Sequence, residues 1–152
     1  MADSENPQED ISVPPAFEGG IEVAIRSREL SYSPYSSFRV GCCIQTKCGK
    51  YISGSNVENA SYGASICAER TAVVRAVMDG HTDDWACIAI SGDSLQQCIS
   101  PCGICRQVLR EFTNPKTFPV VMLNGDGTKR RLMTLEELLP DSFGPDDLHH
   151  TA

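Results

Sequence analysis

The chain has 152 residues, of which 41% are hydrophobic and 22% charged, and its net charge is −7 at neutral pH. These values are typical of one soluble globular domain with room for a sizeable core. Because an acidic surface repels phosphate backbones, we expect no nucleic acid partner. The basic run Lys129-Arg130-Arg131 is short and is more typical of a solvated hairpin edge.

Residues 1–15 are polar, acidic and rich in proline, which predicts a flexible tail ahead of a single domain over residues 16–152. No apolar run follows Met1, so we expect no secretory signal. No stretch approaches the ~20 apolar residues that span a bilayer, so no membrane association is expected. The expected compartment is the reducing cytoplasm, where the eight cysteines are free thiols or metal ligands rather than disulfides.

The first half of the chain begins with an amphipathic helix over residues 16–31, although two glycines weaken its first turn. Pro34 cannot continue this helix and indicates a loop. Residues 38–46 are rich in β-branched and apolar side chains and predict a buried strand, with residues 50–54 as its hairpin partner. The polar segment 56–65 is typical of a loop that carries ligand contacts.

A helix is predicted over residues 67–78, where apolar positions form one stripe, and Gly80 stops it. A strand is predicted over residues 85–92. The next helix covers residues 102–112, with Ser100 as its expected N-cap.

The last third of the chain predicts a strand at 118–123, a turn at 124–127 and a returning strand at 128–133. Residues 134–139 form a short helix in which Thr134 and a glutamate three positions later complete a capping box. Alternating helices and strands predict an α/β sandwich, and the sequence contains no internal repeat or domain linker.

Three cysteines lie at two predicted helix starts, Cys67 in one and Cys102 with Cys105 in the other. The positive end of a helix stabilises a thiolate. Two such helices entering from one edge of a sheet would aim three sulfurs at one point. Three protein ligands with an open fourth position are typical of a catalytic zinc site.

Two other interpretations of these cysteines remain open. Cys102 and Cys105 alone match a redox dithiol, and Cys98 could supply a fourth sulfur, which would make the zinc structural and inert. The other cysteines are expected to be small core residues or, for Cys48 in a turn, incidental: Cys42, Cys43, Cys48 and Cys87.

Glu69 follows Cys67 by two positions and can lean over the fourth zinc position as a proton-shuttling base. The alternative is a first-turn glutamate that complements the helix dipole. Arg70 could offset the excess negative charge of three thiolates by donating to their sulfurs, or it could form a surface ion pair.

The two cysteine segments, Cys-Ala-Glu-Arg at 67–70 and Pro-Cys-Gly-Ile-Cys-Arg-Gln at 101–107, resemble the homotetrameric cytidine deaminases. The resemblance covers nearly all of the chain from about residue 16 to 148. Further matching segments are residues 33–36, 38–41, 56–62, 137–140 and 142–145.

The resemblance implies a three-layer α/β/α sandwich around a mixed five-stranded sheet. It also implies hydrolysis of cytidine and 2'-deoxycytidine to uridine and 2'-deoxyuridine plus ammonia, in pyrimidine salvage. One Zn²⁺ per subunit would be held by Cys67, Cys102 and Cys105, with Glu69 as general acid and base.

The resemblance also implies the substrate contacts. Phe38 would stack on the pyrimidine, Asn56 and Glu58 would hold the ribose, and Ala60 would meet the base through its backbone. Tyr62 and Phe143 would reach a neighbouring subunit's site.

Two competing functions are weighed against this one. Deamination of a base within RNA or DNA is disfavoured by the acidic charge and the lack of a basic groove. A zinc-stapled scaffold module would require the closed four-cysteine site that includes Cys98.

Overall fold

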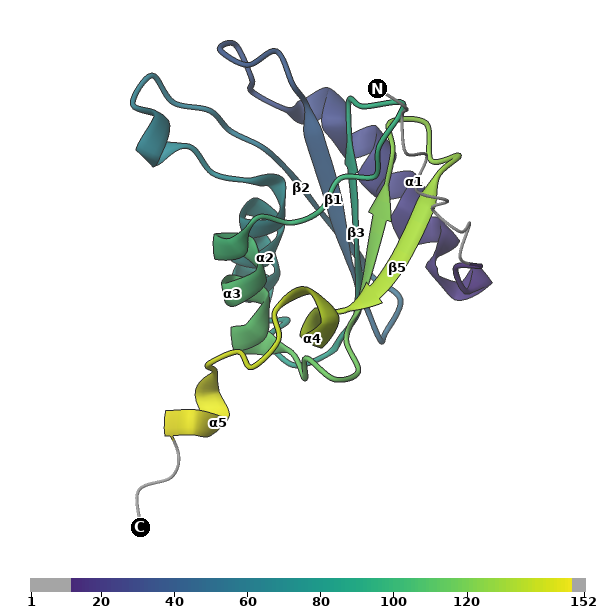
Figure 1. Cartoon of the computed structure of the whole chain (residues 1–152), viewed down its shortest axis with the longest axis vertical. Helices are drawn as coiled ribbons and strands as arrows, with labels where there is room; N and C mark the ends of the chain where they lie inside the picture. The colour runs from purple at the N-terminus through teal and green to yellow at the C-terminus, as the bar shows by residue number, and fades with distance from the viewer. Residues whose placement is uncertain (1–11, 149–152) are drawn as a thin grey trace, which may run out of the picture.

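The computed structural model describes residues 12–148, and in this part of the chain one mixed sheet lies between two layers of helices (Figure 1). The predicted three-layer α/β/α sandwich is therefore confirmed. The strands are β1 (Val40–Thr46), β2 (Tyr51–Ser55), β3 (Trp85–Gly92), β4 (Pro119–Leu123) and β5 (Arg130–Thr134). Their order in the sheet is β2-β1-β3-β4-β5, with β3 and β4 parallel and the other neighbours antiparallel.

Helix α1 (Glu18–Ser27) covers one face of the sheet, between the short 3-10 turns η1 (Pro15–Phe17) and η2 (Arg28–Leu30). Helices α2 (Ala68–Met78), α3 (Gly103–Phe112) and α4 (Leu135–Leu138) cover the opposite face. A 3-10 turn η3 (Tyr62–Ala64) interrupts the long loop before α2, and α5 (Pro145–Leu148) extends away from the body (Figure 1).

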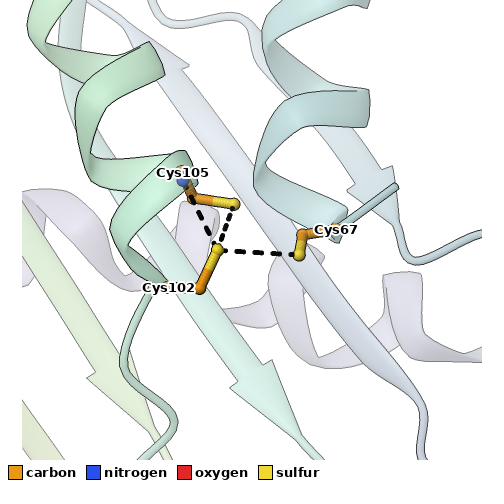
Figure 2. A group of neighbouring side chains, drawn as sticks. All are labelled: Cys67, Cys102 and Cys105. Carbon is orange, nitrogen blue, oxygen red and sulfur yellow. Dashed lines mark hydrogen bonds between the residues drawn. The ribbon is translucent and has the colours of Figure 1, made fainter. Parts of the chain in front are cut away.

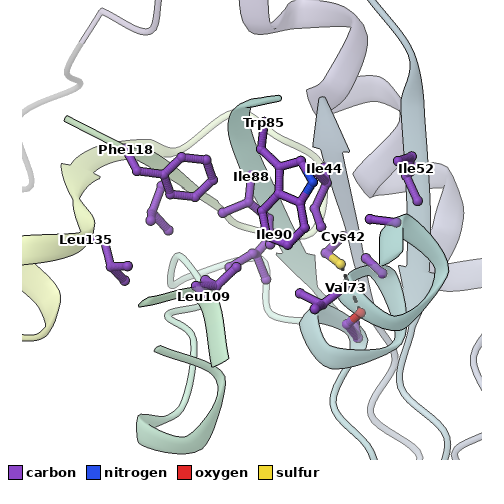
Figure 3. Packing of buried hydrophobic residues seen from close by; sticks show 14 of the residues in the cluster. Cys42, Ile44, Ile52, Val73, Trp85, Ile88, Ile90, Leu109, Phe118 and Leu135 are labelled. Carbon is purple, nitrogen blue, oxygen red and sulfur yellow. Dashed lines mark hydrogen bonds between the residues drawn. The ribbon is translucent and has the colours of Figure 1, made fainter. Parts of the chain in front are cut away.

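Strand alternation divides the core into two clusters. Cys42 and Ile44 of β1 face α2 and α3, whereas Cys43 between them faces α1. Successive side chains of a strand point to opposite faces, so β1, β3 and β4 each contribute to both clusters. The larger cluster packs Trp85, Leu109 and their neighbours between the sheet and α2, α3 and α4 (Figure 3).

Glycines allow the helices to approach the sheet closely. A Cβ at Gly41 would collide with backbone atoms of α1, and one at Gly54 with backbone atoms of α2. The two glycines predicted to weaken the first turn of α1, Gly19 and Gly20, lie against Tyr51 and Gln45, where a side chain would collide or crowd. Gly19 and Gly20 therefore lower the helix propensity of α1 but allow it to pack closely against the sheet.

The predicted boundaries shift at two places that matter for the site. The strand expected from residue 38 begins at Val40, which leaves Phe38 in the preceding loop. The expected N-cap Ser100 is wrong, because α3 begins at Gly103 and Cys102 is its N-cap. The Ser100 hydroxyl instead accepts a hydrogen bond from Arg106 Nη2 at 2.9 Å.

Most of the expected tail, residues 1–11, lies outside the described residues. Val13 already packs against the cluster beneath α1, and Pro15 opens η1. Among residues 12–148, no helix combines the length and the apolar character that a membrane crossing requires.

Candidate functional site

The three predicted cysteine ligands converge at the N-terminal ends of α2 and α3 (Figure 2). Cys67 is the N-cap of α2 and Cys102 the N-cap of α3, while Cys105 lies in the first turn of α3. The Sγ atoms of Cys67 and Cys102 are 3.9 Å apart, and those of Cys102 and Cys105 are 3.5 Å apart. All three sulfurs lie within 4.8 Å of one another.

This spacing fits a zinc ion. With Zn–S bonds of about 2.3 Å, a tetrahedral site separates its sulfurs by about 3.8 Å. Cys98 is not part of the sulfur cluster; it is half-buried and packs against the larger core. The cluster therefore offers three sulfurs and leaves a fourth coordination position to solvent or substrate.

The sulfur cluster is electrostatically coupled. Hydrogen bonding from Cys105, together with Arg70, lowers the pKa of the Cys67 thiol to about 5. The same bond raises the pKa of Cys105. Arg70 Nη2 lies 3.5 Å from Cys67 Sγ and 3.5 Å from the Ser65 carbonyl oxygen, so Arg70 faces the sulfurs rather than a surface acid.

Glu69 lies beside these cysteines and is buried, with 4% of its surface exposed. Burial raises the pKa of its carboxyl group to about 7, and the negative charge of Cys67 acts in the same direction, while a hydrogen bond from Cys105 opposes it. A carboxyl group that titrates near neutral pH can both take up and release a proton. The helix-dipole role alone would not require burial of this side chain.

A cavity of about 320 Å³ opens next to Cys67, a size typical of small-molecule sites. Three of the predicted substrate residues, Asn56, Glu58 and Tyr62, line it together with Cys67. The remaining lining residues are Tyr35, Ser36, Ser65 and Ile66. The loop over residues 56–65, which the sequence predicted to carry ligand contacts, thus forms one wall of the cavity.

Asn56 and Glu58 also hold the loop before β1. Asn56 Oδ1 accepts hydrogen bonds from Ser31 Oγ at 2.5 Å and from Val40 N at 2.8 Å. Glu58 accepts from the Ser36 hydroxyl and from the backbone N–H of Tyr35 and Ser36. Hydrogen bonding from Ser36 lowers the pKa of the Glu58 carboxyl group.

Three of the six predicted substrate contacts are outside the cavity lining. The ring of Phe38 lies over Gly92, where an added Cβ would come within 3.0 Å of Phe38 Cε1. Ala60 is exposed in the loop. Phe143 is exposed ahead of α5, and its carbonyl oxygen accepts from Gln107 Nε2 at 2.9 Å.

Sequence reasoning missed the carboxylate that anchors the start of β1. Asp93, just after β3, accepts from Arg39 Nε and Arg39 N at 2.9 Å each, and from Arg28 Nη1 at 3.0 Å. Arg39 directly follows Phe38, so this network fixes the backbone beside the predicted stacking residue. The partners are 54 residues apart, and no local pattern pairs them.

Known proteins resemble the chain over most of its length. Residues 18–122 match the family model described as the cytidine and deoxycytidylate deaminase zinc-binding region. A protein named probable cytidine deaminase from Dictyostelium discoideum is 41% identical over 87% of this chain and 86% of its own. A cytidine deaminase from Halalkalibacterium halodurans is 43% identical over 85% of this chain and 95% of its own.

Solved structures agree with the sequence relatives. The crystal structure of cytidine deaminase from Burkholderia pseudomallei is 45% identical, covers 83% of this chain and 98% of its own, and superposes with a TM-score of 0.78. The fold, the cysteine cluster and the sequence similarity together show that the chain belongs to the family of zinc-dependent cytidine deaminases.

Proposed function

We propose that this cytidine deaminase hydrolyses both cytidine and 2'-deoxycytidine, and that it serves pyrimidine salvage. Water replaces the amino group, so the products are uridine or 2'-deoxyuridine and ammonia. The observation that carries the proposal is the buried carboxyl group of Glu69 beside three sulfurs, one of which, that of Cys67, lines a cavity of about 320 Å³.

In this proposal Cys67, Cys102 and Cys105 hold the zinc ion. When bound, zinc supplies a Lewis acid that activates water for attack on the amino-bearing carbon. Glu69 takes a proton from that water and delivers it to the adjacent ring nitrogen. Glu69 then takes the proton of the newly formed hydroxyl group and passes it to the amino group, so that the C–N bond breaks, ammonia leaves and the hydroxyl oxygen becomes the carbonyl oxygen of the product.

Arg70 supports the sulfurs in the same proposal. Three thiolates and Zn²⁺ carry a net charge of −1, which weakens the Lewis acidity of the ion. The Nη2 contact of Arg70 to Cys67 Sγ, at 3.5 Å, places a positive charge beside that excess.

The cavity supports assignment of the sugar to Asn56 and Glu58, both of which line it. Their bonds to the loop before β1 hold these two side chains in place, and a bare base lacks the sugar hydroxyls that they would bind, so bare bases should be poor substrates. Phe38 would stack on the pyrimidine, a contact worth ~1–3 kcal/mol. Ala60 is exposed, and in this proposal its backbone meets the base.

We also propose a homotetramer in which Tyr62 and Phe143 complete neighbouring sites. The support is their exposure in a single chain, 76% for Tyr62 and 58% for Phe143. The outer side of α2 exposes Val74, Val77 and Met78, apolar side chains that a partner subunit would cover. A reducing compartment such as the cytoplasm suits the eight cysteines, all of which are thiols.

Replacement of the proposed base tests the function. Glu69→Gln keeps the shape of the side chain and removes its ability to accept and deliver protons. We expect the zinc content to equal that of the wild type treated in the same way, while kcat on cytidine falls by about 10²–10⁴-fold. Ultraviolet absorbance of cytidine loss and elemental analysis of zinc measure the two quantities.

Glu111→Gln is the matched control, because Glu111 is an exposed glutamate on α3 and makes no proposed contact with substrate. Normal kcat in Glu69→Gln would remove Glu69 from the mechanism. Loss of zinc in that variant would assign Glu69 a structural role in the metal site instead. Parallel assays on 2'-deoxycytidine and cytosine test the substrate assignment.

A further inference from the structure

A second group of metal-ligating side chains lies outside the active site. Cys48 Sγ, a ring nitrogen of His81 and a carboxylate oxygen of Asp84 all lie within 4.8 Å of one another. His81 Nδ1 is 2.8 Å from Asp84 Oδ2, and Cys48 Sγ is 3.9 Å from the same oxygen. We refer to these three residues as the Cys48 cluster.

The Cys48 cluster joins two segments that the sheet brings together. Cys48 lies in the turn between β1 and β2, whereas His81 and Asp84 lie in the loop between α2 and β3. Lys47 N donates to the Asp84 carbonyl oxygen at 2.6 Å, and Trp85 Nε1 donates to the His81 carbonyl oxygen at 3.0 Å. These bonds fix the backbones that present the three side chains.

One atom of the cluster lacks a partner. Asp84 Oδ1 is buried and accepts no hydrogen bond from any described residue, whereas the contacts to His81 and Cys48 are made by the other oxygen, Oδ2. A buried polar atom without a partner is costly and calls for a specific explanation, such as a bound ion or water. The His81 side chain is also 13% exposed, so its ring is held in place rather than solvated.

We propose that the Cys48 cluster binds a second divalent transition-metal ion of the Zn²⁺ type, which fastens the β1–β2 turn to the α2–β3 loop. Thiolate, imidazole and carboxylate together are a ligand set that suits zinc. Tetrahedral zinc would separate these ligand atoms by roughly 3.3–3.7 Å. The two distances to Asp84 Oδ2, 2.8 Å from His81 Nδ1 and 3.9 Å from Cys48 Sγ, each lie within about half an ångström of these values, and the sulfur and nitrogen atoms lie within 4.8 Å of each other. A solvent molecule would be the fourth ligand.

Lys50 competes with the metal ion. Its Nζ atom lies 3.3 Å from His81 Nε2, and because lysine can only donate, Nε2 accepts and the ring proton sits on Nδ1. Metal binding at Nδ1 moves the ring proton to Nε2 and releases a proton from Cys48. Lys50 is exposed and can then swing away from the ring, so it weakens the site without closing it.

The Cys48 cluster is separate from the three-sulfur site. Cys67 is the N-cap residue of α2, whereas His81 follows the last turn, and a helix of eleven residues is about 16 Å long. The second site therefore needs neither Glu69 nor substrate. Failure of the proposed catalytic function would leave this proposal intact, and the reverse also holds.

Zinc counting on the purified holoenzyme tests the proposal. After equilibrium dialysis against buffered free Zn²⁺, we expect the wild type to reach two equivalents per chain, with the second removed by a weak chelator. Cys48→Ser and His81→Gln should each stop at one equivalent and keep wild-type turnover. The melting temperature should rise with added Zn²⁺ in the wild type but not in Cys48→Ser, since a ligand of the folded state stabilises it.

Three further variants sharpen the result. Lys50→Gln removes the competing cation and should tighten the second equivalent roughly fivefold. Cys87→Ser, a buried cysteine outside both clusters, should leave two equivalents, as should His149→Ala/His150→Ala. A wild type that stops at one equivalent overturns the proposal. So does a second equivalent that survives in Cys48→Ser or disappears in His149→Ala/His150→Ala.

Discussion

Two residues in this enzyme cap a helix and present a sulfur at the same time. Helix N-caps are usually oxygen-bearing side chains that satisfy a free backbone N–H. Cys102 occupies that position in α3 and accepts from Cys105 N through its sulfur at 3.5 Å, a long contact. A weak cap at this position is understandable if the sulfur is needed for the metal ion, because a helix N-terminus also favours thiolate.

Arg70 should matter for chemistry at the scale of a single contact. Arg70→Gln removes the positive charge beside Cys67 Sγ while keeping an amide donor within reach. We expect kcat/KM for cytidine to fall by roughly 10–100-fold, the typical effect of losing a group that supports metal ligands. Steady-state kinetics on zinc-saturated protein measure this effect.

The control is Arg75→Gln, on the same helix. Arg75 Nη1 donates to the Ser53 carbonyl oxygen and hydroxyl on β2, away from the sulfurs. We expect its kcat/KM to stay within about twofold of the wild type, as for most surface substitutions. Equal losses in the two variants would show that Arg70 acts through general stability rather than through the thiolates.

At the scale of residues, the sequence predicts groups that lie close together in the chain. Cys102 and Cys105 share one turn, and Glu69 follows Cys67 by two positions. Whether the members of each pair lie close together therefore depends only on where the helix begins. The Arg39–Asp93 anchor and the Cys48–Asp84 contact join residues 54 and 36 positions apart. Those pairs depend on strand register and on a register shift between Gln45 and Thr46, which no local pattern specifies.

At the scale of elements, helix placement depends on two glycines on opposite faces of the sheet. Gly54→Ala would push a methyl group into the Ala68 carbonyl and Ala72 N of α2, and Gly41→Ala would do the same to α1. Backbone cannot yield as a flexible side chain does, so each variant should lose about 1–3 kcal/mol in its free energy of unfolding. Urea unfolding of both variants measures the loss.

The two glycine variants should differ in zinc affinity. Gly54→Ala displaces the first turn of α2, where Cys67 is the N-cap, so zinc should bind more weakly. Gly41→Ala displaces α1 on the opposite face and should leave zinc affinity unchanged. Gly63→Ala, with open space around its added Cβ, is the control for both measurements. Weaker zinc binding in Gly41→Ala alone would contradict this account.

The type of each element can be predicted because apolar residues recur with different periods in strands and in helices. The predicted capping box of Thr134 and Glu137 is confirmed. Element boundaries were less predictable. The β-branched and apolar run over residues 38–46 predicts a strand that starts at Phe38, but Asn56 Nδ2 donates to the Phe38 carbonyl oxygen at 3.0 Å and holds Phe38 in the loop. A tertiary contact thus decides where β1 begins, and the sequence alone does not contain it.

At the scale of the whole molecule, Asp93 ties three parts of the chain together: η2 through Arg28, the start of β1 through Arg39, and its own segment after β3. Hydrogen bonding from Arg39 lowers the pKa of Asp93 below its ordinary value of about 3.9. A lowered pKa in the folded state means that the stabilisation is present above pH 3.9 and is lost as the pH falls further.

Asp93→Asn should therefore be less stable than the wild type at pH 7, and the difference should shrink below about pH 4. Urea unfolding at several pH values measures the difference between the two proteins, and any acid release of zinc affects both alike. Asp83→Asn, at an exposed acid before the other end of β3, controls for the change in net charge. A difference that stays constant down to pH 3 would mean that Asp93 stabilises the fold without its charge.

The proposed tetramer makes activity a property of the assembly. Phe143 lies outside the cavity of its own chain and is exposed before α5, so the proposed role requires it to act in a neighbouring site. Phe143→Ala alone should lower kcat/KM by about 10–100-fold, as expected for loss of an aromatic contact with a base. Glu69→Gln alone should be inactive for a different reason, because it lacks its own base.

Hybrids of these two variants separate a contact between subunits from one within a chain. Glu69→Gln chains still carry Phe143, and Phe143→Ala chains still carry Glu69. In an equal mixture allowed to exchange subunits, half of the chains keep Glu69. Half of those chains have a neighbour that supplies Phe143. The activity of the mixture should therefore recover to roughly a quarter of the wild-type activity. If the activity of the equal mixture is only the average of the two parent activities, Phe143 acts in its own chain's site. The control is a mixture of Glu111→Gln with Phe143→Ala, which shows how much activity is contributed by chains that supply Phe143 and also keep Glu69.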